Sequence, residues 1–314
     1  MLKYIVKRML IMIPIILGIS FIIFAILDLT PGDPARMILG DSATNEAVEE
    51  LREEMGLNDN FIYRYISYVK NALRGDFGKS YRSGLPVLYE LFARLPHSLK
   101  LAFGSIIIVV IISIPIGIIS AVKQYSLIDT ISLISAFLLT SMPSFWFGIM
   151  LILVISLKLD LLPATGAGAD SWKHFVLPSI AMAGSGVAIV VRMTRSSMLE
   201  VVRQDYIRTV KAKGAGETRI IIKHALKNAL LPIVTIIGVE FGSLLGGGMI
   251  IESVFAIPGI GSMTVNAIRM KDTPLVIASI TFVAIAISFI NLIVDLLYVY
   301  IDPRLKTSIE QASR

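Results

Sequence analysis

The side chains that most often carry out covalent chemistry in proteins are absent or scattered in this chain. Its 314 residues include no cysteine, which excludes thiol catalysis, disulfides and thiolate metal sites. The three histidines, His97, His174 and His224, fall in three different polar segments, and none has the serine and acidic partners of a nucleophilic site. The sequence therefore predicts no catalytic residues, no metal site and no cofactor.

One short match to a phosphate-binding loop also fails. Gly78-Lys79-Ser80 resembles the end of the G-x-x-x-x-G-K-[ST] motif, but Leu73 occupies the position of its first glycine. No other stretch of the sequence matches, so we expect no nucleotide-hydrolysing site of this type in the chain.

Four residues of a long apolar run, Asn228–Ile251, point to a different kind of site. Gly238, Gly242 and Gly246 recur every four residues, which leaves one helix face without side chains and lets another helix approach closely. Glu240 lies among them, and an ionisable group inside a membrane is costly and is by default a functional candidate. We expect these residues to serve a translocation path or helix packing. The alternatives for Glu240 are a carboxyl paired with Arg or Ser on a neighbouring helix and one that lies near the outer interface.

The apolar runs of the chain are long enough to cross a membrane. A spanning helix needs about 20 largely apolar residues, because its backbone must satisfy its own hydrogen bonds there. The chain is 55% hydrophobic and 17% charged, with a mean hydropathy of +0.78. We therefore expect an all-α membrane protein with six transmembrane helices. The runs are Met9–Leu27, Leu101–Val122, Thr130–Leu157 (which holds Pro143 and is long enough to be kinked), Phe175–Val191, Asn228–Ile251 and Thr273–Val294.

Lysine and arginine predict the orientation, because they gather in cytoplasmic loops. With six spans both termini lie on one side, and that side holds Lys3, Lys7, Arg8, Lys123 and the basic residues between 192 and 227. Both termini are therefore expected in the cytoplasm. The net charge of +6 follows these loops, so we expect a lipid bilayer around the chain and no nucleic acid partner. Asp129 and Asp295 sit at span ends, where we expect them to be solvated.

The spans divide the chain into four parts. We expect an N-terminal transmembrane helix at 1–27, too long for a cleaved signal peptide, and an extracytoplasmic loop domain at 28–100. A transmembrane core at 101–302 and a cytoplasmic tail at 303–314 complete the chain. The extracytoplasmic segment has apolar residues at helical spacing around 47–55 and 61–73, which predicts two amphipathic helices. A structural cap is favoured there over direct substrate contact.

The cytoplasmic segment 192–227 has a helix–turn–helix pattern. Its apolar residues from Met198 to Val210 follow a helical period, Gly214-Ala215-Gly216 interrupts the helix, and Glu217 opens a second one. Its basic residues alone would set membrane topology, but a broken amphipathic pair also suits a rigid docking surface. Both interpretations stay open on the pattern.

Several motifs resemble those of a known family. Residues 204–214 and 223–232 look like the cytoplasmic coupling segment of binding-protein-dependent ABC importer permeases, in particular those for dipeptides, oligopeptides and nickel. Arg208-Thr209-Val210 departs from the Glu-Ala-Ala of the general pattern, as in the peptide and nickel branch. Further motifs follow in the family's order over nearly the whole chain, at 29–34, 75–80, 94–96, 143–148, 258–261 and 302–304.

This resemblance implies the type I ABC importer permease fold and a non-catalytic transport subunit of a bacterial or archaeal plasma membrane, with dipeptides or oligopeptides as cargo. It implies three kinds of partner subunit: a second homologous permease, two cytoplasmic ABC ATPases that hydrolyse ATP, and an extracytoplasmic solute-binding protein. By position, the residues that would form or frame the ATPase contact are Arg208, Thr209, Ala212, Gly214, Ala215, Gly216 and Glu217.

Two other functions are weighed against this one. A nickel permease of the same family is the first, although the sequence has no cage of soft ligands. A secondary transporter is the second; it would need an ion-coupling site, usually several buried acids or broken helices in two related halves. The sequence shows one acid in mid-span and no evident repeat.

Overall fold

The computed structural model describes residues 2–40, 42–166 and 171–301, and every regular element in them is a helix. The Asp302-Pro303-Arg304 motif and the expected tail at 303–314 lie outside the described residues. Among these described residues, five helices are long and apolar enough to cross a membrane, and each corresponds to an expected span. They are α1 (Leu2–Leu29), α5 (Val87–Val122), α8 (Lys173–Val202), α11 (Lys227–Val254) and α13 (Thr273–Ile301).

The remaining span is broken rather than kinked. Helix α6 (Leu127–Ser141) is followed at an angle of 103° by α7 (Ser144–Leu151) and the π-helix η1 (Ile152–Lys158). The break falls at Met142 and Pro143, and Met142 has an extended backbone with φ −86° and ψ 128°. Proline lacks an N–H and disfavours helical geometry in the residue before it, which explains the sharp turn.

Helix α8 lies at the centre of the bundle. It packs against α5, α6, α7 and α11, and 72% of its most apolar window is buried, against 11% for the peripheral α1. The sequence predicts a span of 17 residues here, Phe175–Val191, whereas the helix has 30 residues. Small residues such as Ala183 and Gly186 let its neighbours approach, so α8 faces protein instead of lipid and needs less hydropathy.

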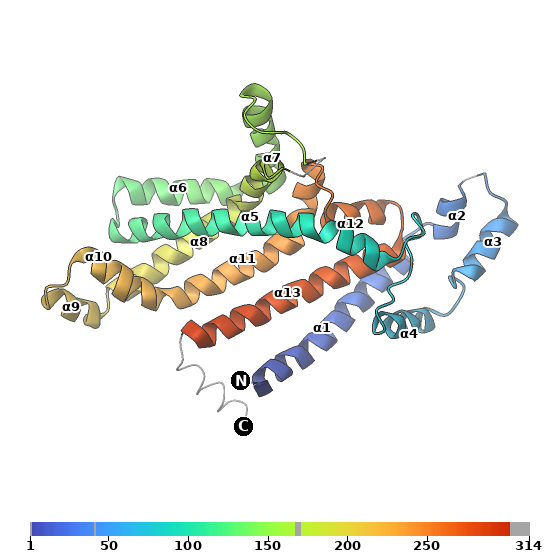
Figure 1. Cartoon of the computed structure of the whole chain (residues 1–314), viewed down its shortest axis with the longest axis horizontal. Helices are drawn as coiled ribbons and strands as arrows, with labels where there is room; N and C mark the ends of the chain where they lie inside the picture. The colour runs from blue at the N-terminus through green and yellow to red at the C-terminus, as the bar shows by residue number, and fades with distance from the viewer. Residues whose placement is uncertain (1, 41, 167–170, 302–314) are drawn as a thin grey trace.

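The two ends of the bundle carry different segments (Figure 1). The start of α1 lies at the same end as α9 (Asp205–Ala212) and α10 (Glu217–Arg219), while the opposite end carries α2 (Pro34–Leu39), α3 (Asn45–Glu54), α4 (Phe61–Ala72) and α12 (Ile260–Arg269). This arrangement agrees with the predicted alternation, in which α9 and α10 are cytoplasmic and α2 to α4 lie outside.

Helices α3 and α4 confirm the two predicted amphipathic helices. Thr44 accepts a hydrogen bond from the Ala47 N–H and caps α3, and Asn60 caps α4 in the same way. Helix α4 packs on α1, where the ring of Phe21 meets that of Tyr65 edge-on and the Tyr65 hydroxyl donates to Leu17 O at 2.8 Å. Residues 87–100, placed by the sequence in the loop, form the first turns of α5.

Candidate coupling surface and buried acidic residues

Helix α9 and the turn after it form a short surface at the cytoplasmic end. The turn is tight: Gly214 N–H donates to Lys211 O at 3.0 Å, and Ala215 N–H donates to Val210 O. Gly214 has φ +81°, a conformation that glycine adopts without the strain a side chain brings. Helix α10 then opens at Glu217 and continues through the π-helix η2 (Ile220–Leu226) into α11, so that 38 residues form one stretch.

The apolar side of this segment is anchored to the bundle. Ile207 of α9 and Ile220 of η2 are buried in one cluster with Met198 of α8, Ala121 of α5 and Ile233 of α11. The Asn228 side-chain amide also donates to the Tyr206 hydroxyl at 2.7 Å, which joins α9 to the start of α11. A displacement of α9 therefore acts directly on three long helices.

Of the seven predicted coupling residues, six lie outside this buried cluster and Ala215 packs against it. Six are exposed and Ala215 is half-buried. One detail of the prediction was wrong: the apolar pattern from Met198 to Val210 is not one helix, because α8 ends at Val202 and α9 begins at Asp205. Helical periodicity alone does not reveal so short a break. The exposed residues are Arg208, Thr209, Ala212, Gly214, Gly216 and Glu217.

Asp129 is not solvated, contrary to the expectation from its position at a span end. It is 2% exposed and accepts two bonds from Arg195, from Nε at 2.7 Å and from a terminal nitrogen at 2.8 Å. Ser120 Oγ donates at 2.5 Å and the Tyr125 N–H at 2.9 Å. The pair joins the first turn of α6 to α8. Asp295, also expected in solvent, forms an ion pair with Arg8 at 3.0 Å.

The predicted path residues of α11 face two different neighbours. A Cβ at Gly238 would overlap Val294 of α13, and Gly242 and Gly246 face Ile287 of the same helix. Glu240 is turned to α8, where a Cβ on Gly186 would lie 3.1 Å from its Oε2. Within the described residues, no hydrogen bond or ion pair involves the Glu240 carboxylate. The alternative in which this carboxyl pairs with Arg or Ser is therefore not supported.

Helix α11 has a second buried acid besides Glu240, Glu252, which was not predicted from the sequence. It is 2% exposed, accepts from Ser98 Oγ at 2.6 Å and from the Ser262 N–H at 2.9 Å, and so connects α11, α5 and α12. Gly259 and Gly261 lie so close to its carboxylate that a side chain would not fit. The predicted span ended one residue before Glu252, at Ile251. The nearby Pro258-Gly259-Ile260-Gly261 motif was the feature of the sequence that could have indicated this site.

Comparison with known proteins gives two family matches. The model described as binding-protein-dependent transport system inner membrane component matches residues 113–307, and the N-terminal model of such membrane components matches residues 1–102.

Similar proteins cover the whole chain. The dipeptide transport system permease protein DppB of Alkalihalophilus pseudofirmus is 41% identical, over 98% of this chain and 100% of its own length. The glutathione transport system permease protein GsiC of Escherichia coli K12 is 39% identical, over 98% and 99%. Among solved structures, a chain of the inward-facing MetNI methionine ABC transporter matches with a TM-score of 0.58 and 17% identity, covering 68% of this chain and 97% of that one.

Proposed function

The chain belongs to the family of binding-protein-dependent transport system inner membrane components and is a permease subunit of an ABC importer; we propose that its cargo is short peptides. It is a multi-pass protein of the inner membrane. The observation that carries the peptide proposal is the identity of 39–41%, over nearly the full length, with permeases for a dipeptide and for glutathione, itself a peptide. Nickel is not favoured, because both of these relatives are permeases for peptides.

The proposal for coupling starts from the exposed surface of α9 and the turn. The seven coupling residues named above, which lie between Arg208 and Glu217, would form or frame the contact with a cytoplasmic ATPase that hydrolyses ATP. The buried cluster around Met198 and Ile220 would then transmit the motion to α5, α8 and α11. A rigid element transmits displacement that a flexible loop would absorb. A second permease would complete the path, and an extracytoplasmic binding protein would deliver the peptide.

Uptake by the reconstituted complex tests this function. The chain is co-purified with its second permease and ATPases, placed in liposomes and supplied with the binding protein, labelled L-alanyl-L-alanine and ATP. We expect uptake that requires ATP and the binding protein, and no uptake of nickel. Uptake by the chain alone in response to a proton gradient would instead support a secondary transporter and overturn the proposal.

A further inference from the structure

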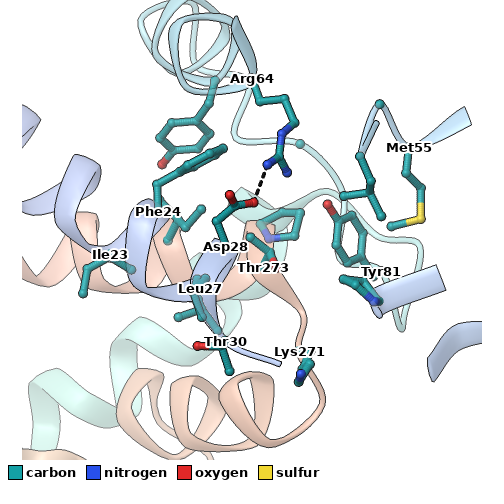
Figure 2. A pocket seen from close by; sticks show the side chains of 18 of the residues that line it. Ile23, Phe24, Leu27, Asp28, Thr30, Met55, Arg64, Tyr81, Lys271 and Thr273 are labelled. Carbon is teal, nitrogen blue, oxygen red and sulfur yellow. Dashed lines mark hydrogen bonds and ion pairs between the residues drawn. The ribbon is translucent and has the colours of Figure 1, made fainter. Parts of the chain in front are cut away.

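A cavity of about 660 Å³ lies at the outer end of the molecule (Figure 2). Residues from the ends of α1 and α3, from α4, from the segment 76–81 and from the start of α13 line it. Its volume falls within the range of about 300–1,000 Å³ that is usual for small-molecule sites. The cavity shares no residue with the coupling surface or with Glu240.

Three cationic side chains in this cavity have hydrogen-bond donors without an acceptor. They are Lys271 Nζ, Arg64 Nε and Arg52 Nε, and each of these atoms is buried. Arg64 pairs with Asp28 through a terminal nitrogen, and Arg52 pairs with Asp33 and Glu49 in the same way, so in both residues it is the Nε that has no acceptor. Folded proteins leave few buried donors unpaired. Three in one cavity make it a candidate site for a ligand that supplies acceptor atoms.

Lys271 is held in place by the residue that follows it. It adopts φ +51°, an uncommon backbone conformation for a residue with a side chain, and such strain concentrates at functional sites. Asp272 is buried and accepts from Ser80 Oγ at 2.5 Å and from the Tyr81 N–H at 3.1 Å. These bonds hold the loop against the segment 80–81, and the buried ammonium group of Lys271 lies against Gly32.

The other residues that line the cavity suit a ligand that carries both a positively and a negatively charged group. Asp59 and Asp76 also line the cavity, together with the rings of Phe24, Tyr63 and Tyr81. Burial and the nearby Asp272 carboxylate raise the pKa of Tyr81 to about 12. Its hydroxyl is protonated at neutral pH, as in any tyrosine, and can donate a hydrogen bond. A carboxylate would pair with the free donors, an ammonium group with the acids, and apolar side chains with the rings.

We propose that this cavity binds a short peptide on the outer side of the permease, with its terminal carboxylate on Lys271. The proposal rests on the proposed function, in which the cargo is a peptide. It adds a peptide site on the permease chain itself, separate from the site of the binding protein.

Equilibrium binding tests the site. The complex of both permeases and the ATPases, without binding protein, is placed in phosphatidylcholine nanodiscs and titrated with labelled L-alanyl-L-alanine. We expect saturable binding that weakens at least tenfold in Lys271→Met. Lys70→Met is the matched control, because Lys70 is exposed on α4 and lies outside the cavity lining; it should bind like the wild type. A C-terminally amidated dipeptide should compete at least tenfold less well than the free acid.

Three results would overturn the site: no saturable binding, unchanged binding in Lys271→Met, or equal competition by the amidated peptide. Displacement of dialanine by phosphatidylglycerol in the nanodisc or by inorganic phosphate would also overturn it, and would assign the donors to a phosphate group. If Lys271→Met folds poorly, the site can still be tested by measuring binding to Lys271→Gln and competition by the amidated dipeptide on the wild-type complex. If the complete system takes up the peptide but this cavity does not bind it, the proposed site is refuted and the proposed function stands. If the complete system takes up no peptide, the proposed function itself is refuted.

Discussion

Asp129 and Arg195 form a two-bond ion pair that joins the first turn of α6 to α8, near the cytoplasmic ends of both helices. Helix α8 ends seven residues after Arg195, shortly before the α9 surface, and α6 leads to the sharp break at Pro143. The pair thus connects the segment that we propose to contact the ATPase with the broken span.

Loss of Arg195 should weaken both stability and coupling. Arg195→Met leaves a buried carboxylate without its partner, a change that costs about 3–5 kcal/mol in buried pairs. Thermal unfolding and ATP-driven uptake of the complex measure the two effects. The double variant Asp129→Leu/Arg195→Met should recover part of the stability but not the uptake; full recovery of uptake would show that the pair has no part in coupling. Glu49→Gln, in an exposed pair with Arg52, should change stability by less than about 1 kcal/mol.

Gly214 and Gly216 should respond differently to the same substitution. Gly214→Ala places a side chain at φ +81° and should cost about 1–2 kcal/mol, with lower uptake per ATP hydrolysed. Gly216 has φ −65° and open space around a Cβ, so Gly216→Ala should keep the stability of the wild type. Thermal unfolding compares the two variants, and equal losses of stability would contradict the importance of the Gly214 conformation. The ratio of uptake to ATP hydrolysis in proteoliposomes measures the effect of Gly214→Ala on coupling.

The close contact of α11 with α13 predicts a compensating pair. Gly238→Ala should destabilise the protein, because the added Cβ overlaps Val294. Val294→Ala removes the obstacle, so the double variant should be more stable than Gly238→Ala alone in thermal unfolding. Gly247→Ala meets nothing within 4 Å and is the control, for which no loss is expected. Additive losses in the double variant would refute the contact.

The two buried acids of α11 should also differ. Glu252→Ala removes the acceptor for Ser98 and Ser262 and leaves buried donors unpaired, which costs about 1–3 kcal/mol. Hydrogen exchange at residues 258–262 should increase. Glu240→Gln breaks no bond within the described residues and should leave stability unchanged. A fall in uptake for Glu240→Gln would then support its proposed place in the translocation path; normal uptake would leave it a packing residue.

The features that could be predicted from the sequence are those that depend on residues close together in the chain. Hydropathy located the apolar runs, helical spacing located α3 and α4, and the glycines marked the turn at 214–216. The length of α8 was not predicted, because a helix surrounded by protein needs less hydropathy than one in lipid. Nor were the bonds of Asp129 to Arg195 and of Glu252 to Ser98, whose partners are 66 and 154 residues apart, since no local period reports such contacts.

Cysteine crosslinking tests the proposed coupling surface most directly, because the chain has no cysteine of its own. Thr209→Cys, exposed on α9, is combined with single cysteines in the co-purified ATPase, and Ser42→Cys, exposed at the outer end, is the control. We predict a crosslink from position 209 to the ATPase that changes in yield when ATP binds, and none from position 42. Labelling of position 209 by a membrane-impermeant maleimide added outside the cell, or absence of the crosslink, would contradict the account.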